Sequence, residues 1–308
     1  MQSSQRYELT TTRTRPSSAT FVCQQKRSQS PKTQAEYRMT SSKRPVPLAL
    51  ALVVGFCTAT LSESSFGMDL FEIQVYRDDI NAPGHFGLEL HANYTISGRQ
   101  QAAYPGEQPP NHVARLTLEP ALGITEFFEL SAYLQNMMND DGRYRFAGVK
   151  LRGKFVLPER YTHRFFLGLN IEFGRLPHAA EQEEWSNEFR PFAGWYNGHW
   201  LFDVNPIVGY ALSGADKFKP EFEPAGKLGF NTQYGFMLGA EYYSGLGLLA
   251  NPSPLREQEH LLFATFDLAE PAESGIEQPW ELNLGIGKAL TSATPQQWIL
   301  KAIVGRSF

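Results

Sequence analysis

The chain has 308 residues, of which 42% are hydrophobic and 13% aromatic, and its formal net charge at pH 7 is −4. A mean hydropathy of −0.34 together with so many aromatic residues is typical of a membrane β-barrel, whose lipid-facing and interior residues alternate. The two cysteines are Cys23 and Cys57, so the chain beyond them holds no thiol for a disulfide, a zinc site or a nucleophile.

The first 67 residues are predicted to be a leader. Residues 1–38 are rich in Ser, Thr, Gln, Arg and Lys, which predicts a disordered extension or a miscalled start. From Met39 to Gly67 the chain looks like a signal peptide, because an apolar run of 14 residues at 48–61 follows the basic pair Lys43 and Arg44. Such a run is too short to cross a bilayer as a helix. We expect cleavage between Gly67 and Met68.

Removal of the leader changes the charge of the protein. Residues 1–67 hold nine of the 28 Lys and Arg residues and three of the 32 Asp and Glu residues, so the remaining chain has a net charge of −10. An acidic protein is a poor partner for nucleic acid, and we expect no such partner.

Residues 68–83 form a separate N-terminal segment. Leu70–Tyr76 alternates as a strand does, and a turn-rich joint follows it up to Gly84. Counting this stretch as a strand makes the total odd, whereas bacterial barrels of one chain have an even number of strands. We therefore expect it to be periplasmic or folded into the barrel.

From residue 84 to residue 308 a period of two dominates, which predicts an all-β fold. The expected strands are 85–96, 114–122, 128–135, 144–157, 165–173, 188–196, 200–210, 220–231, 235–245, 257–267, 279–290 and 297–308. These twelve segments predict an antiparallel up-and-down transmembrane β-barrel. The short turns near 123, 158–163, 197–199 and 231–233 are expected to be periplasmic. The longer loops 97–110, 138–143, 175–186, 213–219 and 246–256 are expected to be extracellular, and the turn 268–278 is longer than this scheme predicts.

The last strand carries the expected assembly signal. Trp298, Leu300, Val304 and Phe308 share one face of the segment 297–308, which ends the chain on an aromatic residue. This ending resembles that of bacterial outer-membrane β-barrels, whose final Phe or Trp is recognised by the insertion machinery. The resemblance implies a location in the outer membrane, with its lipids and its assembly machinery as partners. We expect this strand to close the barrel against the strand that begins near Gly84.

The polar faces of the strands are expected to line the lumen. The candidate lumen and selectivity residues are Glu89, His91, Arg115, Glu129, Lys150, Arg152, Lys154, Glu172, Glu188, Arg190, Asp203, Asn205, Glu241 and Glu281. Charges of both signs are interspersed, so they can pair across strands and lock the wall. The alternative is a selective pore in which Lys150, Arg152 and Lys154 face acidic residues across a narrow lumen.

The sequence gives little support for a catalytic site or a metal site. The seven histidines are scattered, with no Ser motif near them and no HxH or HxxxH spacing. We predict no catalytic residue, no metal ligand and no cofactor. Two alternatives to a porin-like protein stay open: a non-conducting structural or adhesion barrel that binds partners through its loops, and a lipid-modifying barrel enzyme.

A narrower resemblance rests on two short strings. Glu188-Phe189-Arg190-Pro191 and Val204-Asn205-Pro206 resemble a family of transporters associated with phenol-type aromatic degradation. The resemblance implies passive passage of small solutes, including hydrophobic or aromatic ones. Because proline breaks a hydrogen-bonded ladder, we also expect bulges at Pro191 and Pro206.

Overall fold

Alternation of apolar and polar residues gives each strand one apolar face and one polar face, and the chain buries the polar faces together. The computed structural model describes residues 68–157, 159–268 and 280–308, which belong to one structural unit. Its strands are β1 (Phe86–Gly98), β2 (Ala114–Thr125), β3 (Phe128–Met138), β4 (Tyr144–Val156), β5 (Phe165–Arg175), β6 (Trp185–Tyr196), β7 (Trp200–Asn205), β8 (Val208–Ala211), β9 (Glu221–Phe222), β10 (Ala225–Asn231), β11 (Phe236–Gly245), β12 (Gly247–Leu248), β13 (Asn251–Pro252), β14 (Glu259–Leu268), β15 (Glu281–Ala289) and β16 (Gln296–Ser307). The short helix α1 (Glu159–Thr162) and a 3-10 turn (Leu255–Glu257) lie between strands.

These segments form a closed antiparallel barrel of twelve strands within the described part of the chain. The pairs β7 and β8, β9 and β10, and β11 and β12 are each two parts of one barrel strand. The ring closes between β1 and β16, where Leu90 lies opposite Val304 and Tyr94 opposite Leu300. The predicted fold class and the predicted closing pair are both confirmed.

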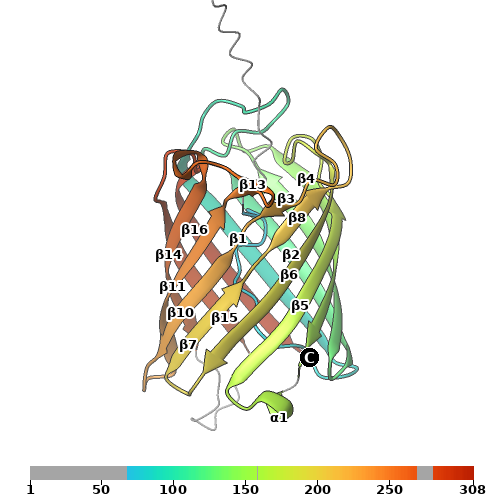
Figure 1. Ribbon diagram of the computed structural model, residues 1–308, viewed down its shortest axis with the longest axis vertical. Coiled ribbons are helices and arrows are strands. Elements are labelled where there is room, and N and C mark those ends of the chain that lie inside the picture. Colours follow the sequence, from blue (N-terminus) through green and yellow to red (C-terminus); the bar gives the residue numbers. More distant parts are fainter. Residues whose placement is uncertain (1–67, 158, 269–279) are drawn as a thin grey trace, which may run out of the picture. The chain divides into compact units, whose positions relative to one another are not determined.

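The long connections and the short turns lie at opposite ends of the barrel (Figure 1). We call them the loop end and the turn end. Phe86 and Phe308 lie at the turn end, where the backbone N–H of Phe308 donates to the carbonyl of Phe86 at 2.8 Å. The long turn expected at 268–278 falls almost wholly outside the described residues, as do the predicted leader 1–67 and its cleavage site.

The two strand prolines interrupt the ladder without adding a residue. On β6, Ala193 pairs with Val204 of β7, and Phe189 pairs with Val208 of β8. The register is therefore the same on both sides of Pro206, and Pro191 lies opposite Leu169 with no shift. The predicted bulges at these prolines are wrong, because proline removes one donor but leaves the residue count of the strand unchanged.

A bulge forms instead in β4. Gln135 of β3 pairs with Gly148, whereas Asn136 pairs with Phe146, so Ala147 is the extra residue. Gly148 has φ +119, a conformation that suits glycine. The sequence pattern predicts that Ala147 faces outward, yet the bulge turns it into the interior, where it is fully buried.

The outer face of the barrel is apolar, and aromatic residues gather near both of its ends. Large exposed side chains on it include Leu90, Leu118, Leu134, Leu151, Leu167, Val204, Leu238, Leu284, Leu300 and Val304. Aromatic pairs lie at the turn end (Phe86 with Phe308, Phe128 with Phe155, Trp200 with Phe230) and at the loop end (Phe173 with Trp185, Phe189 with Tyr210). An apolar band between two aromatic girdles matches the hydrocarbon layer and the interfaces of a bilayer.

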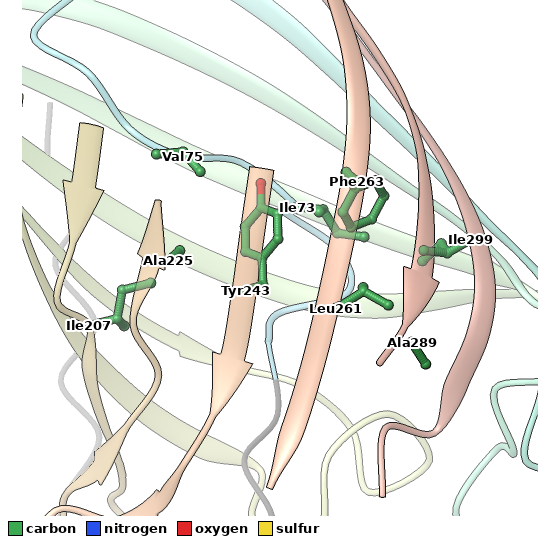
Figure 2. Close-up of a cluster of buried hydrophobic side chains, with 9 residues drawn as sticks. All are labelled: Ile73, Val75, Ile207, Ala225, Tyr243, Leu261, Phe263, Ala289 and Ile299. Carbon is green, nitrogen blue, oxygen red and sulfur yellow. The ribbon is translucent and has the colours of Figure 1, made fainter. Parts of the chain in front are cut away.

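Residues Met68–Pro83, which we call the lumen segment, run through the interior of the barrel from the loop end to the turn end. Figure 2 shows Ile73 and Val75 of this segment beside Tyr243, Phe263 and Ile299 of the wall, with which they form a buried cluster. Phe71 and Tyr76 belong to two further clusters. Of the two predicted placements of 68–83, the inward-folded one is therefore the one observed.

Deletion of Phe308 is expected to reduce assembly of the barrel several-fold while leaving solute selectivity unchanged. The ring of Phe308 lies 6.4 Å from that of Phe86 and under the guanidinium of Arg306, outside the lumen. Heat-modifiable migration of the membrane-extracted protein on gels measures the folded fraction. The variant Phe308→Trp keeps an aromatic end and should assemble normally, whereas equal assembly of the deletion variant would contradict the predicted role.

Candidate functional site

The lumen wall is a set of charged side chains that neutralise one another. Eleven of the fourteen candidate residues have buried side chains: His91, Arg115, Glu129, Lys150, Arg152, Lys154, Glu172, Arg190, Asp203, Asn205 and Glu241. Glu89 and Glu188 are partly buried, and Glu281 is exposed at the turn end, where it lines two cavities of the lumen. These side chains lie on the inner face of the barrel wall, whereas a role in selectivity stays a prediction.

The basic residues of β4 pair with nearby acids. Arg152 lies 2.7 Å from both Glu119 and Glu129, on strands β2 and β3. Lys150 contacts Asp69 of the lumen segment and lies 3.7 Å from Glu172 on β5, and Lys154 lies 3.6 Å from Asp79. The predicted arrangement, in which this basic cluster faces acids across the lumen, is therefore wrong: its partners come from neighbouring strands and from the lumen segment.

A second cluster centres on Glu241 of β11. The carboxylate of Glu241 lies 2.9 Å from Lys227, contacts Lys301, and accepts a hydrogen bond of 2.7 Å from the hydroxyl of Tyr243. Lys227 also lies 2.7 Å from Asp267. Side chains from β10, β11, β14 and β16 are thus held in one buried network, which fixes the wall on this side.

The lumen segment is held by side chains that bond its backbone. Asn205 accepts from the N–H of Tyr76 at 2.7 Å and donates to its carbonyl at 3.1 Å. Thr117 donates to the carbonyl of Phe71 at 3.0 Å, and Lys301 to that of Ile73 at 3.1 Å. An extended chain without strand partners needs such bonds, because buried peptide groups are costly when unpaired.

Tyr76 is the centre of these contacts. Its hydroxyl lies 2.7 Å from that of Tyr133 on β3. The cationic groups of Arg152, Lys154 and Arg190 lie 5.3, 5.7 and 4.6 Å from its ring centroid. Arg152, Lys154 and Arg190 were predicted from the sequence as lumen residues, whereas Tyr76 and Tyr133 were not. Tyr133 lies on the polar face of its strand, and this position was the signal that could have identified it as a lumen residue.

Cavities lie between the lumen segment and the wall of the barrel. One of about 100 Å³ lies beside Val75, Lys227 and Glu241, and another of about 230 Å³ lies at the turn end beside Asn81 and Lys154. Lysine and glutamate side chains line both. The lumen segment therefore occupies part of the interior of the described barrel, and it lines both cavities.

One trio of side chains has the composition of a metal site. Ligand atoms of Glu89, His91 and Glu119 all lie within 4.8 Å of one another, and His91 Nε2 lies 3.1 Å from Glu119. Glu89 and Glu119 face each other in the β1–β2 register, a pairing that the sequence analysis did not use. Because Arg152 already bonds Glu119, a further cation here would meet repulsion. That His91 is not catalytic stays a prediction.

The loop end carries a carboxyl group of altered acidity. Glu181, between β5 and β6, lines a cavity with residues of the lumen segment. Burial disfavours its charged form and raises its pKa to about 8, and the nearby Asp69 acts in the same direction. The carboxyl group is therefore mainly neutral at pH 7.

This pKa predicts a fall in stability at alkaline pH. The folded state keeps the Glu181 proton up to about pH 8, whereas the unfolded chain loses it near the ordinary glutamate pKa of 4.5. The folded state therefore binds more protons within that window, and the free energy of unfolding falls as the pH rises through it. Glu181→Gln, which mimics the neutral form, should gain stability relative to the native chain between pH 5 and pH 8, as measured by urea midpoints in micelles. A constant difference over that range would contradict the assignment.

Among the described residues, no helix is long and apolar enough to cross a bilayer. No protein-family model matches the chain, and no curated protein matches it. The resemblance to transporters of aromatic degradation therefore gains no support from a family match and stays a prediction.

Several solved structures are similar to this chain. The KdgM porin is 9% identical, with a TM-score of 0.46, over 72% of this chain and 99% of that one. The COG4313 outer membrane channel from Pseudomonas putida F1 is 11% identical, with a TM-score of 0.49, over 77% and 100%. The NanC porin is 8% identical, with a TM-score of 0.44, over 72% and 98%. Values this low carry no information about function, so the fold stands on the strand pairing described above.

Proposed function

We propose that the protein is a porin-like channel of the outer membrane that passes small solutes passively once the lumen segment moves. The observation that carries the proposal is the occupant of the lumen. A polar interior is filled by a separate segment, held by side-chain contacts and not by strand pairing. Such a segment can leave the lumen without breaking the barrel, whereas a wall strand cannot.

The apolar outer band and the two aromatic girdles support the membrane location. A polar lumen with an apolar exterior inverts the arrangement of a soluble protein, and closed barrels of this kind have no free strand edge in lipid. The girdles and the even number of antiparallel strands favour the bacterial outer membrane. Small solutes, including hydrophobic or aromatic ones, are the proposed cargo.

Conductance in planar bilayers tests the proposal. The native chain should show rare openings, and a variant in which residues 70–80 are replaced by a Gly/Ser segment of equal length should show frequent ones. The replacement keeps the chain length while it removes the buried side chains of the lumen segment, among them Phe71, Ile73 and Tyr76. No conductance steps at any voltage from either folded protein would refute the channel.

A non-conducting structural barrel is the second candidate. The pairing of lumen cations with carboxylates favours it, because a neutralised interior locks the wall without providing a path. In the same bilayer experiment this candidate predicts no conductance steps from either protein, so one measurement separates the two functions.

A further inference from the structure

Arg115 differs from the other lumen cations. Lys150, Lys154, Lys227, Lys301, Arg152 and Arg190 each form an ion pair with a carboxylate. Among the described residues, Arg115 on β2 has no carboxylate within ion-pairing distance. Its hydrogen bond runs from Nη1 to the Thr95 hydroxyl at 3.4 Å, which uses one of its five N–H groups. Its side chain is nevertheless only 7% exposed.

The guanidinium of Arg115 lines a cavity of about 230 Å³ at the loop end. Met68, Leu70 and Phe71 of the lumen segment form an apolar side of this cavity, and Arg115 lies 5.6 Å from the ring centroid of Phe71. The buried hydroxyl of Tyr104, from the loop between β1 and β2, has no hydrogen-bond partner within the described structure and also lines the cavity. A cation, a free hydroxyl and an apolar surface therefore meet in one place.

Two of the five acidic residues that line the cavity are paired with arginines. Glu107 lies 2.5 Å from Arg99, and Glu257 lies 3.0 Å from Arg256. The carboxylate of Glu183 lies against Gly214 in the next loop, and Glu259 has a partner of its own. Glu181 keeps its proton at pH 7, because its pKa is about 8. Of the two described cations that line this cavity, Arg99 has Glu107 as its partner, whereas Arg115 has no carboxylate partner.

We infer that this cavity binds a small organic carboxylate whose apolar body lies on Phe71 and Leu70. The guanidinium fork matches the two oxygens of a carboxylate, and Tyr104 can donate to the same group. Burying a guanidinium without a carboxylate partner costs free energy, and a bound anion offsets that cost. The inference rests on the proposed function, since it names the class of solute that the channel takes at its loop end, next to the first described residues of the lumen segment.

Equilibrium binding of benzoate to the full chain in lipid nanodiscs tests the inference. We expect one benzoate per chain, and we expect benzyl alcohol, which has a similar shape and no charge, to bind at least about tenfold more weakly. Arg115→Met should lower benzoate affinity by a similar factor. The matched control is the double variant Arg99→Gln with Glu107→Gln, which removes a guanidinium from the same cavity together with its carboxylate partner, so its affinity should stay within about twofold.

Three outcomes would overturn the inference: no saturable benzoate binding to the native chain, equal binding of benzyl alcohol, or unchanged affinity in Arg115→Met. If Arg115→Met fails to fold, Arg115→Lys replaces it. Its affinity for benzoate should then lie between the affinity of the native chain for benzoate and that of the native chain for benzyl alcohol. The comparison of benzoate with benzyl alcohol needs no variant at all. If the barrel conducts salt but does not bind benzoate, this site alone is refuted. If it binds benzoate but never conducts, the proposed channel is refuted.

Discussion

Replacement of Tyr76 by alanine is expected to release the lumen segment and to raise the open fraction of the channel at least about a hundredfold. The side chain is 1% exposed and carries contacts to three cations and to Tyr133. Truncation of a buried aromatic residue to alanine costs about 3–5 kcal/mol, and each ~1.4 kcal/mol is a factor of ten in an equilibrium. The cost falls on the closed state, because in the open state the segment has already left these contacts.

Single-channel recording of Tyr76→Ala measures this shift as the fraction of time spent conducting. Tyr76→Phe is the matched control, since it keeps the ring under Arg190 and loses the bond to the hydroxyl of Tyr133, worth about 1 kcal/mol. Tyr133→Phe removes the same bond from the wall side and should behave alike. If Tyr76→Ala folds and opens no more often than Tyr76→Phe, the segment is not held by this ring.

The strand pattern predicted the barrel well because a period of two is a local property. Each inward residue follows from its neighbours in sequence, so the lumen face could be assigned without knowledge of pairing. The assignment failed at Ala147, because the bulge at Ala147 and Gly148 shifts the inward–outward alternation of the strand by one residue. A single glycine in an alternating strand was the available sign of such a shift.

The partners of the lumen charges were not predictable in the same way. Lys227 and Glu241 face each other across one hairpin, so their pairing follows from the turn between them. Lys301 reaches Glu241 from β16, with two strands between, and it passes close to Gly285, which has no side chain to block it. Such contacts depend on the curvature of the wall and on small residues along the path, which no local pattern records.

The lumen segment shows a related limit. Leu70–Tyr76 alternates as a wall strand does, and the even strand number of known barrels was the reason for leaving it out of the wall. Its place inside depends on Asn205 and Thr117, which bond its backbone from distant strands. The separation of 129 residues between Tyr76 and Asn205 lies far beyond the range of a sequence pattern.

Glu241→Gln is expected to destabilise the barrel by about 3–5 kcal/mol, because removing one partner of a buried ion pair leaves an uncompensated charge. Lys227 keeps Asp267 at 2.7 Å in this variant. Lys301, which is 3% exposed, keeps the Ile73 carbonyl at 3.1 Å and no carboxylate among its described contacts. The denaturant concentration at half unfolding in micelles should fall well below that of Asp141→Asn, which makes the same change in an exposed pair with Arg143 worth about 0–1 kcal/mol.

The double variant Glu241→Leu with Lys301→Met separates charge from packing. It removes both charges of the pair and leaves Lys227 with Asp267, so it should recover a large part of the stability lost in Glu241→Gln. Recovery means that the unpaired ammonium of Lys301 causes the loss of stability in Glu241→Gln. A double variant as unstable as the single one would mean that its own lost bonds, from Tyr243 to Glu241 and from Lys301 to the Ile73 carbonyl of the lumen segment, offset the gain from removing the charge. In that case the double variant should also open the channel more often, and a bilayer recording of the same protein decides between the two.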